Sequence, residues 1–468
     1  MNTHAVLLQG IAILIQCVIV LMATVSDSWD SAVTLSQLYL LAQSIAFIAI
    51  IMDNRRGGIS YMIEFFLLFF IALPALLQIS KRVFPWFAML QPIHICSAFG
   101  ILAISHVALH TGFILHNKHN SNQVHIYQQQ GLSNESALFY TKWAWLIALG
   151  AMILAVLAGP SNLLVARFEL SEVNSKGMAT QFKFMCRSLS LLAMVLMLYL
   201  IKYIHNPVLK RQNLYALLLF LPLFLIINYL PALPRFLLFG IFIAISTIFI
   251  NYFSPKIKIL VAIASIFTLF VVFPAIKSLG AGELNSEGFT QRADTGAISD
   301  YLMRVDFDAF MQITSTVQFY SSNISSIRYG ENFLGVVLFF VPRAIWPSKP
   351  IDTGEIVSTG LGFEYTNVSS PLPAEALMGF GLIGPVLVFY LLAWFVSRVE
   401  SRAVSTASTK PIISSFVLYA ITMGFIVIIL RGALNGVAPQ FATAFLAFFV
   451  MQFFKNKRIV LNGRKRLD

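Results

Sequence analysis

The most regular feature of the chain is a series of apolar segments of about 20 residues, separated by short polar stretches. An apolar run of this length is what a helix needs to cross a bilayer. We therefore predict an all-α polytopic membrane protein with about twelve transmembrane helices. The predicted spans are 5–24, 33–52, 61–79, 93–115, 141–160, 188–204, 213–230, 236–254, 257–276, 375–397, 411–430 and 436–454.

One long interruption divides this series. Residues 277–373 separate an N-terminal membrane bundle of about nine helices (1–276) from a C-terminal bundle of about three (374–454), which is followed by a basic tail (455–468). Within the interruption, the apolar stretch from Asn332 to Val341 is too short to span a bilayer. We expect it to form a half-buried or re-entrant helix, and the long segment to contain short helices.

The composition is typical of a membrane protein, and the distribution of charge predicts its orientation in the membrane. Hydrophobic residues make up 58% of the chain and charged residues 11%, which is far from the average of a soluble domain. With twelve spans and both termini on one side, that side carries 18 of the 32 Lys and Arg residues, whereas most acids fall on the other. The positive-inside rule identifies the basic side as cytoplasmic. We expect a multi-pass protein of the bacterial cytoplasmic membrane, with segment 277–373 outside.

A second polar segment, residues 161–187, falls on the outer side in this topology. It carries Arg167, Lys176, Lys183 and Arg187, more positive charge than the rule favours for a short outer loop. These residues either have a function there or are ordinary juxtamembrane charges.

The cysteines and histidines do not predict a cofactor. Cys17, Cys96 and Cys186 form no close pair, so we expect neither a disulfide framework nor a cysteine metal site. His106 and His110 have the spacing of a two-histidine metal site on a helix, but no acidic ligand lies on that span, so we expect no metal. No nucleotide-binding glycine loop is present. We therefore expect no cofactor and no nucleic-acid partner.

Three arginines on the predicted outer face stand in rigid or tight contexts. Arg235 follows the Pro-Ala-Leu-Pro string, Arg343 lies between two prolines, and Arg431 opens the turn between the last two spans. A guanidinium group suits phosphate because its planar fork donates two parallel hydrogen bonds. We expect a shared site for an anionic group; the alternative is that each arginine is an interfacial anchor.

Other residues of the long segment offer further chemistry. Trp346 is either a stacking platform for a sugar or an interfacial belt residue, and Lys349 sits in a stretch stiffened by prolines. Glu375 stands at the start of an apolar span, where desolvation would raise its pKa and suit it to accept a proton. It is otherwise an ordinary acid at a helix N-terminus. Asp306 is the next candidate acid, although Asp306 and Asp308 could simply pair with Arg304.

Several strings in the second half resemble, in order, the bacterial O-antigen and capsular repeat-unit polymerases of the Wzy type. The strings are Arg304-Val-Asp306-Phe-Asp-Ala-Phe, Tyr329-Gly330, Pro342-Arg343-Ala-Ile-Trp346-Pro347-Ser-Lys349-Pro350, Ala374-Glu375 with Gly379, Gly381 and Gly384, and Arg431-Gly432. The resemblance covers about Asp300 to Gly436. It implies a GT-C-like helical membrane fold and a glycosyltransferase that joins oligosaccharide units carried on undecaprenyl pyrophosphate. It also implies membrane lipid, a chain-length regulator and a flippase as partners.

Two departures from that family limit what is carried over. Ala433 follows Arg431-Gly432 where relatives often carry an acid, so that turn supplies no catalytic carboxylate. The interval from Arg167 to Gly177 is one residue shorter than the Arg-to-Gly motif of polymerase outer loops.

The residues and the resemblance together predict a mechanism. Arg343, Arg431 and Arg235 would hold the pyrophosphate, with Arg304, Lys349 and Arg167 as further cationic contacts and Trp346 stacked on a sugar. Glu375, or failing that Asp306, would deprotonate the attacking hydroxyl. An O-antigen ligase and a flippase or other transporter are the alternatives to a polymerase.

Overall fold

The computed structural model describes residues 3–87, 89–116, 134–164, 178–272, 301–322, 327–404 and 413–464. Within these ranges the chain is helical and contains no strand. Eleven described helices are long and apolar enough to cross a membrane, which establishes the expected polytopic class. They are α1 (Thr3–Ala23), α2 (Trp29–Met52), α3 (Gly58–Phe66) continued by the π-helix η1 (Leu67–Ala72) and α4 (Leu73–Lys81), α5 (Pro92–Leu115), α6 (Asn134–Ala158), α8 (Met178–Tyr203), α9 (Pro207–Ile227), α11 (Pro255–Phe267) continued by η6 (Thr268–Val272), α19 (Ile383–Val404), α20 (Ile413–Arg431) and α21 (Leu434–Arg464).

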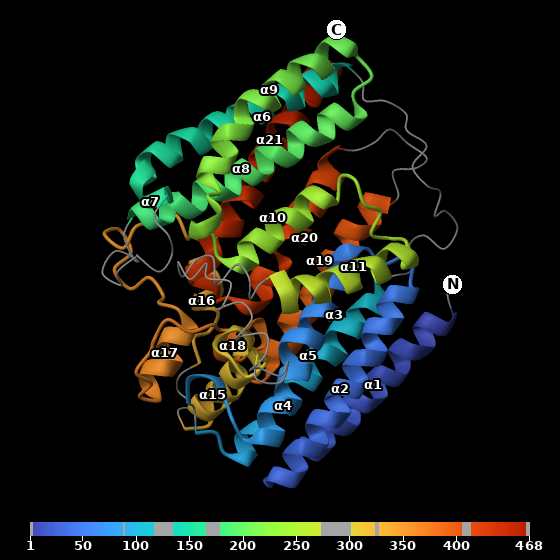
Figure 1. Cartoon of the computed structure of the whole chain (residues 1–468), viewed down its shortest axis with the longest axis vertical. Coiled ribbons are helices and arrows are strands. Elements are labelled where there is room, and N and C mark those ends of the chain that lie inside the picture. The colour runs from blue at the N-terminus through green and yellow to red at the C-terminus, as the bar shows by residue number, and fades with distance from the viewer. Residues whose placement is uncertain are drawn as a thin grey trace, which may run out of the picture.

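The helices form one bundle with a central layer. Helices α1, α2, α3 and α5 lie on one side, and α6, α8, α9 and α21 lie on the other (Figure 1). Between them run α10 (Arg235–Ser246), α19 and α20, with α10 packed along α20. Apolar side chains from all three groups make up one continuous core. Many side chains of α1, α6 and α9 point outward and are apolar, as expected for lipid-facing helices.

The predicted span 236–254 differs from the helix in the structure. Helix α10 ends at Ser246 and has 12 residues, a rise of about 18 Å that is short of the roughly 30 Å hydrocarbon core. The backbones of α10 and α20 are in close contact, because a Cβ on Gly240 would lie only 2.1 Å from the Gly424 carbonyl oxygen. Small residues allow this backbone approach between membrane helices. The predicted twelve spans are therefore eleven long helices and one short apolar helix in the described chain.

The predicted span 375–397 is also divided. Helix α18 (Leu372–Phe380) ends at Gly381, whose φ of 62° and ψ of −152° are essentially restricted to glycine, and α19 starts at Ile383. A Cβ on Gly384 would lie 1.9 Å from the Ala376 carbonyl oxygen. The two helices therefore fold against each other at glycines, and α18 is a separate short helix.

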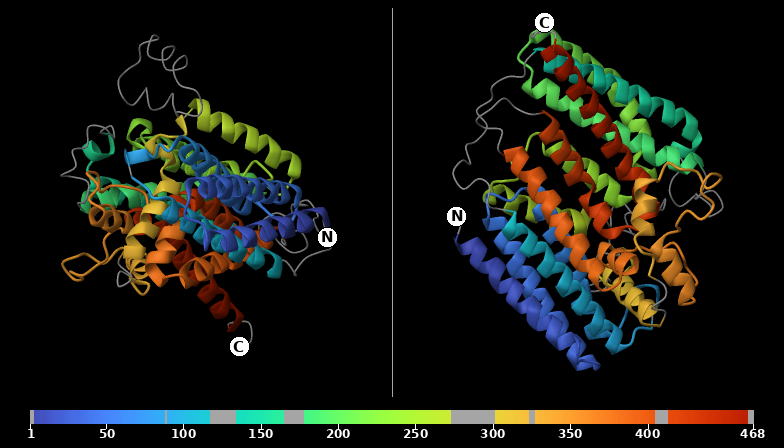
Figure 2. Two further views of the ribbon diagram at one scale, coloured as in Figure 1. Left: turned by 90° about the horizontal axis from the view of Figure 1, so that it is seen from below. Right: turned by 180° about the vertical axis from the view of Figure 1, so that it is seen from behind.

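Short helices gather at one end of the bundle. The 3-10 helix η7 (Val305–Phe307), α15 (Ala309–Ser322), α16 (Glu331–Val337) and α17 (Thr353–Gly360) lie there with α18. Figure 2 shows the same grouping from two further sides, and the start of α1 and the end of α21 lie away from it (Figure 1). Helix α15 is buried from Ala309 to Val317 against α5 and α18. The described part of segment 277–373 is thus built into the bundle, and its short helices include the one expected near Asn332.

The opposite end of the bundle is held by buried charged residues. Lys258 Nζ donates to the carbonyl oxygens of Ile50 (2.8 Å) and Asp53 (2.7 Å). Ser60 donates through its backbone N–H and its hydroxyl to Glu400, both at 2.8 Å. These bonds fix the turn between α2 and α3 to α11 and α19. Since the acids and bases there are buried together, they stabilise one arrangement of helix ends.

Candidate anion-binding site

Two of the predicted arginines come together because their helices run antiparallel. Arg235 is the first residue of α10 and Arg431 is the last residue of α20. The Arg431 guanidinium lies over the ring of Phe236, with its carbon 4.4 Å from the ring centroid. A cation in the first turn of a helix opposes the helix dipole, so Arg235 is not explained by the stability of α10. The antiparallel pair therefore places two guanidinium groups at one end of the bundle.

Asp306 is the partner of Arg235. The two side chains meet through both nitrogens of the fork, at 3.2 Å (Nη1 to Oδ2) and 3.0 Å (Nη2 to Oδ1). Asp306 belongs to η7, and it keeps 17% of its side-chain surface exposed, against 19% for Arg235. The predicted pairing of Asp306 with Arg304 is not observed. Arg304 is exposed, with its guanidinium carbon 5.9 Å from the Tyr301 ring centroid.

Asp308, two residues further on, is the partner of Arg431. Its Oδ1 accepts from Arg431 Nη2 at 3.2 Å and from Ser369 Oγ at 2.9 Å, and its Oδ2 accepts from Trp86 Nε1 at 3.2 Å. The Asp308 side chain is 2% exposed. The short segment 306–308 thus supplies one carboxylate to each arginine.

Glu375 lies beside this arrangement but plays a different part in it. Its side chain is completely buried in α18. The Leu434 N–H donates to Oε1 at 3.0 Å, while Asn332 Nδ2 (2.7 Å) and Thr353 Oγ1 (2.6 Å) donate to Oε2. Burial raises the pKa of the Glu375 carboxyl above its ordinary value, while these donors act in the opposite direction. The carboxylate therefore joins α16, α17, α18 and the turn that follows Arg431.

Several polar atoms around Glu375 and Arg431 are buried without a hydrogen-bond partner among the described residues. They are Arg431 Nε, Asn332 Oδ1, Ser370 Oγ and both polar side-chain atoms of Asn435. Buried polar groups are nearly always paired with protein or water. Unpaired donors next to a half-buried guanidinium indicate a place where water or a polar ligand binds.

The predicted site residues of the proline-rich string form a loop of their own. Arg343 donates to the carbonyl oxygens of Lys349 (2.6 Å) and Pro350 (3.3 Å), and Lys349 Nζ donates to those of Phe339 (2.6 Å) and Val341 (3.0 Å). Both cations therefore brace the backbone of residues 339–350.

This loop touches the neighbourhood of the anion site at one end. Trp346 Nε1 donates to Ser348 Oγ at 3.1 Å, so the indole N–H is satisfied within the loop. A Cβ on Gly335 would meet both Asn435 and Pro350, so the loop's end and the start of α21 lie against the same glycine. The hydrogen bonds of Arg343, Trp346 and Lys349 thus stay within the loop and do not reach the pair of arginines.

The basic residues of the predicted outer segment 161–187 are only partly described by the structure. Arg167 lies outside the described residues. Lys183 and Arg187 are buried in the first half of α8, where Lys183 donates to the Asn162 carbonyl oxygen at 2.6 Å and Arg187 to those of Ile227 (3.2 Å) and Ala232 (3.3 Å). Arg187 thereby holds the segment that leads to Arg235. The sequence drew attention to Lys183 and Arg187 only through the excess of positive charge in a predicted outer loop.

Two contributors to the site are not among the predicted site residues. The sequence suggests Asp308 as a pair for Arg304 and, after Glu375, as an acid to try together with Asp306, and it does not single out Arg328. Arg328 donates to the Ile351 carbonyl oxygen at 3.0 Å and acts electrostatically on Glu375. Asp308 lies in the string that starts at Arg304, whereas Arg328 stands in none of the quoted strings, and the partners of both residues are distant in the sequence.

The chain was compared with family models, with curated proteins and with solved structures, and none of the three comparisons gave a match.

Proposed function

We propose that the protein polymerises oligosaccharide repeat units carried on a lipid pyrophosphate, at the outer face of the bacterial cytoplasmic membrane. The product would be an O-antigen, capsular or exopolysaccharide chain. The observation that carries the proposal is the pair formed by Arg235 and Arg431 at one end of the bundle. Each is half-buried and held by its own carboxylate.

The chemistry of the leaving group explains why such a pair is useful. Polymerisation breaks the bond between an anomeric carbon and the pyrophosphate oxygen, and a hydroxyl oxygen of the incoming unit forms the new glycosidic bond. The lipid pyrophosphate leaves with the electron pair, and the hydroxyl proton passes to a base. Fixed cations stabilise the charge that develops on the leaving oxygen, and they need no reorganisation when they are held in advance.

The geometry favours different roles for the two candidate acids. Asp306 is the accessible one, because it keeps part of its surface exposed and lies against Arg235. It is our candidate for the group that orients and deprotonates the hydroxyl. Glu375 already accepts three hydrogen bonds in a closed environment. We assign it a positioning role for the turn after Arg431.

Deletion of the gene, followed by analysis of lipid-linked and cell-surface glycans, tests the function. Single repeat units on surface lipid support a polymerase. Full-length chains that stay on the carrier lipid indicate a ligase, and units retained on the cytoplasmic side indicate a flippase. Either of the last two results would overturn the proposal.

Variants in the deletion strain then test the site. Arg431→Ala and Arg235→Ala should both abolish long chains at normal membrane abundance. Arg398→Ala is the matched control, because Arg398 is an exposed arginine in α19 that lies over Trp394 away from the pair. Normal ladders from Arg431→Ala would remove the arginine pair from the mechanism, whereas loss of chains from Arg398→Ala would point to a general effect of removing an arginine.

A further inference from the structure

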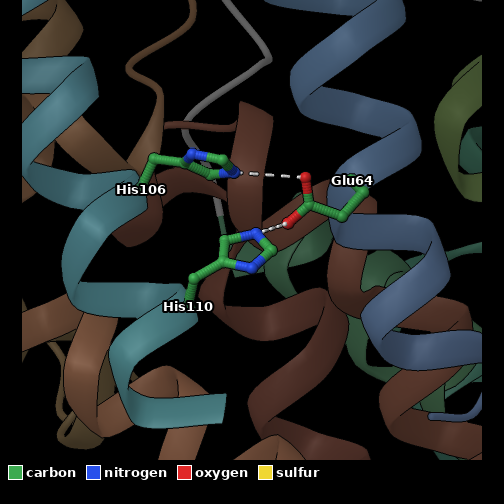
Figure 3. A group of neighbouring side chains, drawn as sticks. All are labelled: Glu64, His106 and His110. Carbon is green, nitrogen blue, oxygen red and sulfur yellow. Dashed lines mark hydrogen bonds and ion pairs between the residues drawn. The ribbon is translucent and has the colours of Figure 1, made fainter. Parts of the chain in front are cut away.

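A second polar cluster lies inside the membrane helices and plays no part in the proposed function. Glu64 projects from α3, and His106 and His110 project from α5, where a spacing of four residues puts both rings on one face (Figure 3). His106 Nε2 lies 3.4 Å from Glu64 Oε2, and His110 Nε2 lies 3.0 Å from Glu64 Oε1. All three side chains are at most 1% exposed. Two imidazoles therefore converge on one buried carboxylate.

The spacing of these atoms fits a metal ion. One ligand atom from each residue can be chosen so that all three lie within 4.8 Å of one another. Around a tetrahedral zinc ion, ligands at about 2.0–2.1 Å from the metal lie roughly 3.3–3.4 Å apart. The separation of each Nε2 atom from the carboxylate oxygen that it faces, 3.4 Å for His106 and 3.0 Å for His110, is close to that value. Two histidines and a glutamate are also a known zinc ligand set.

Charge favours a bound cation over a simple hydrogen-bonded cluster. An ionised carboxylate inside a bilayer is costly unless it is paired. Among the described residues, Glu64 has no salt bridge to Lys or Arg, and its only ion-pair partners are the two histidines. With both imidazoles deprotonated at Nε2, two nitrogen lone pairs and one carboxylate face the same point. A divalent ion would use all three of these ligands, which is why we favour a metal at this cluster.

The surrounding backbone gives independent support. Helix α3 passes into the π-helix η1 directly after Phe66, two residues beyond Glu64. Such wide turns inside membrane or soluble helices often mark functional positions. Both η1 and α5 pack against α15, the helix that begins after Asp308. A metal ion that joins α3 to α5 would thus stabilise the packing of α15, the helix that follows the carboxylate partner of Arg431.

We infer that Glu64, His106 and His110 bind a divalent transition-metal ion, Zn²⁺ by ligand type, which joins α3 to α5 within the membrane. The Nδ1 atoms of both histidines are buried without a partner among the described residues. Tight zinc sites usually hold that nitrogen with a carboxylate or a carbonyl. The site is therefore of moderate affinity, and its ion exchanges with a chelator.

Metal content of the purified full-length protein tests the inference directly. Protein produced with added zinc, purified in detergent and desalted, should contain about one zinc ion per chain by plasma mass spectrometry. Glu64→Gln and His110→Ala should each lower that content at least tenfold. His116→Ala is the matched control, since His116 follows the same helix but bonds to Tyr390 instead of Glu64. It should keep the wild-type zinc content.

A second measurement covers the case in which a cluster variant fails to fold. A chelator should lower the thermal unfolding midpoint of wild-type protein and of His116→Ala, and added zinc chloride should restore it. Wild-type protein without zinc and without this response would overturn the inference and leave a histidine–glutamate ion pair. Equal zinc in wild type and in the folded cluster variants would also overturn it, because the metal would then be bound elsewhere. Neither readout depends on polymer formation.

Discussion

The guanidinium of Arg431 lies over the ring of Phe236, the residue that follows Arg235. The aromatic side chain next to Arg235 in the sequence therefore supports the other cation of the candidate site. Because Arg431 contacts the ring face and also donates to Asp308, its fork is fixed before any ligand binds. This arrangement makes the pair of arginines a rigid site.

Replacing the ring tests this support. Phe236→Leu keeps an apolar side chain but removes the cation–π contact, which is worth about 0.5–2 kcal/mol. We expect the yield of long chains to fall by roughly 2- to 30-fold, less than for Arg431→Ala. Chain-length profiles at matched membrane abundance measure the effect. A profile identical to wild type would show that the ring does not hold Arg431 in its working position.

The close contact of α10 and α20 should be equally sensitive. In Gly240→Ala the new Cβ would meet the Gly424 carbonyl oxygen, so the helices must separate. Overpacking of this kind costs about 1–3 kcal/mol, and here it also displaces Arg235 from Arg431. We expect a lower unfolding midpoint and short glycan chains. Gly10→Ala on α1 is the control, because a Cβ there meets nothing within 4 Å. Normal chain length in Gly240→Ala would contradict the predicted coupling.

The sequence was sufficient to predict the membrane class and the positions of most spans, because apolar runs of about 20 residues are rarely found outside membrane helices. It was less informative at α10 and at Gly381. An early helix end and a positive φ depend on close backbone contacts that hydropathy does not record. The predicted topology put Arg235 and Arg431 on the same side of the membrane. It did not predict that α10 and α20 pack against each other.

The partners of the site residues could not be predicted. Asp308 and Arg431 are 123 positions apart, and Glu64 lies 42 and 46 positions from its two histidines on another helix. The span of His106 and His110 contains no acid, and its other residues of ligand type, His94 and Cys96, stand at least ten positions before His106. The third candidate ligand comes from a neighbouring helix, which only packing can reveal.

Arg343 has a different expected effect from Arg431. Because its guanidinium holds two carbonyl oxygens of its own loop, Arg343→Ala should loosen residues 339–350 and shorten the glycan chains. Arg343→Lys should restore little, since one ammonium group cannot replace the two-pronged fork. Protease sensitivity of this loop, measured together with chain length, checks the explanation. Shortened chains with unchanged protease sensitivity would instead assign Arg343 directly to ligand binding.

The topology can be tested with single cysteines. Cys17, Cys96 and Cys186 are first replaced by serine or alanine, and Ser348→Cys or Asn456→Cys is then introduced at an exposed position. A membrane-impermeant thiol reagent applied to intact spheroplasts should label Ser348→Cys and leave Asn456→Cys unlabelled. After permeabilisation, both should react. Labelling of both sites from the outside would refute the orientation inferred from charge.

Glu375 gives a pH-dependent prediction. Burial raises the pKa of its carboxyl in the folded protein above the ordinary value of 4.5. The folded state therefore binds the proton more tightly than the unfolded state, and the associated stability is present at low pH and is lost as pH rises through the folded pKa. Relative to Glu375→Gln, the unfolding midpoint of wild-type protein should fall as the pH is raised above 4.5. The same difference between the two proteins at every pH would show that Glu375 does not titrate in this range.

The activity of Glu375→Gln separates a positioning role from a role as general base. The amide cannot accept all three hydrogen bonds, so a positioning residue should lose stability by about 1.5–3 kcal/mol, and elongation should fall with it. A general base would instead lose roughly 10²–10⁴-fold in elongation at nearly unchanged stability. Glu331→Gln, at an exposed acid of α16, controls for removal of a charge nearby. Unfolding midpoints and glycan ladders from the same membranes decide between the two, and wild-type results in both would remove Glu375 from the site.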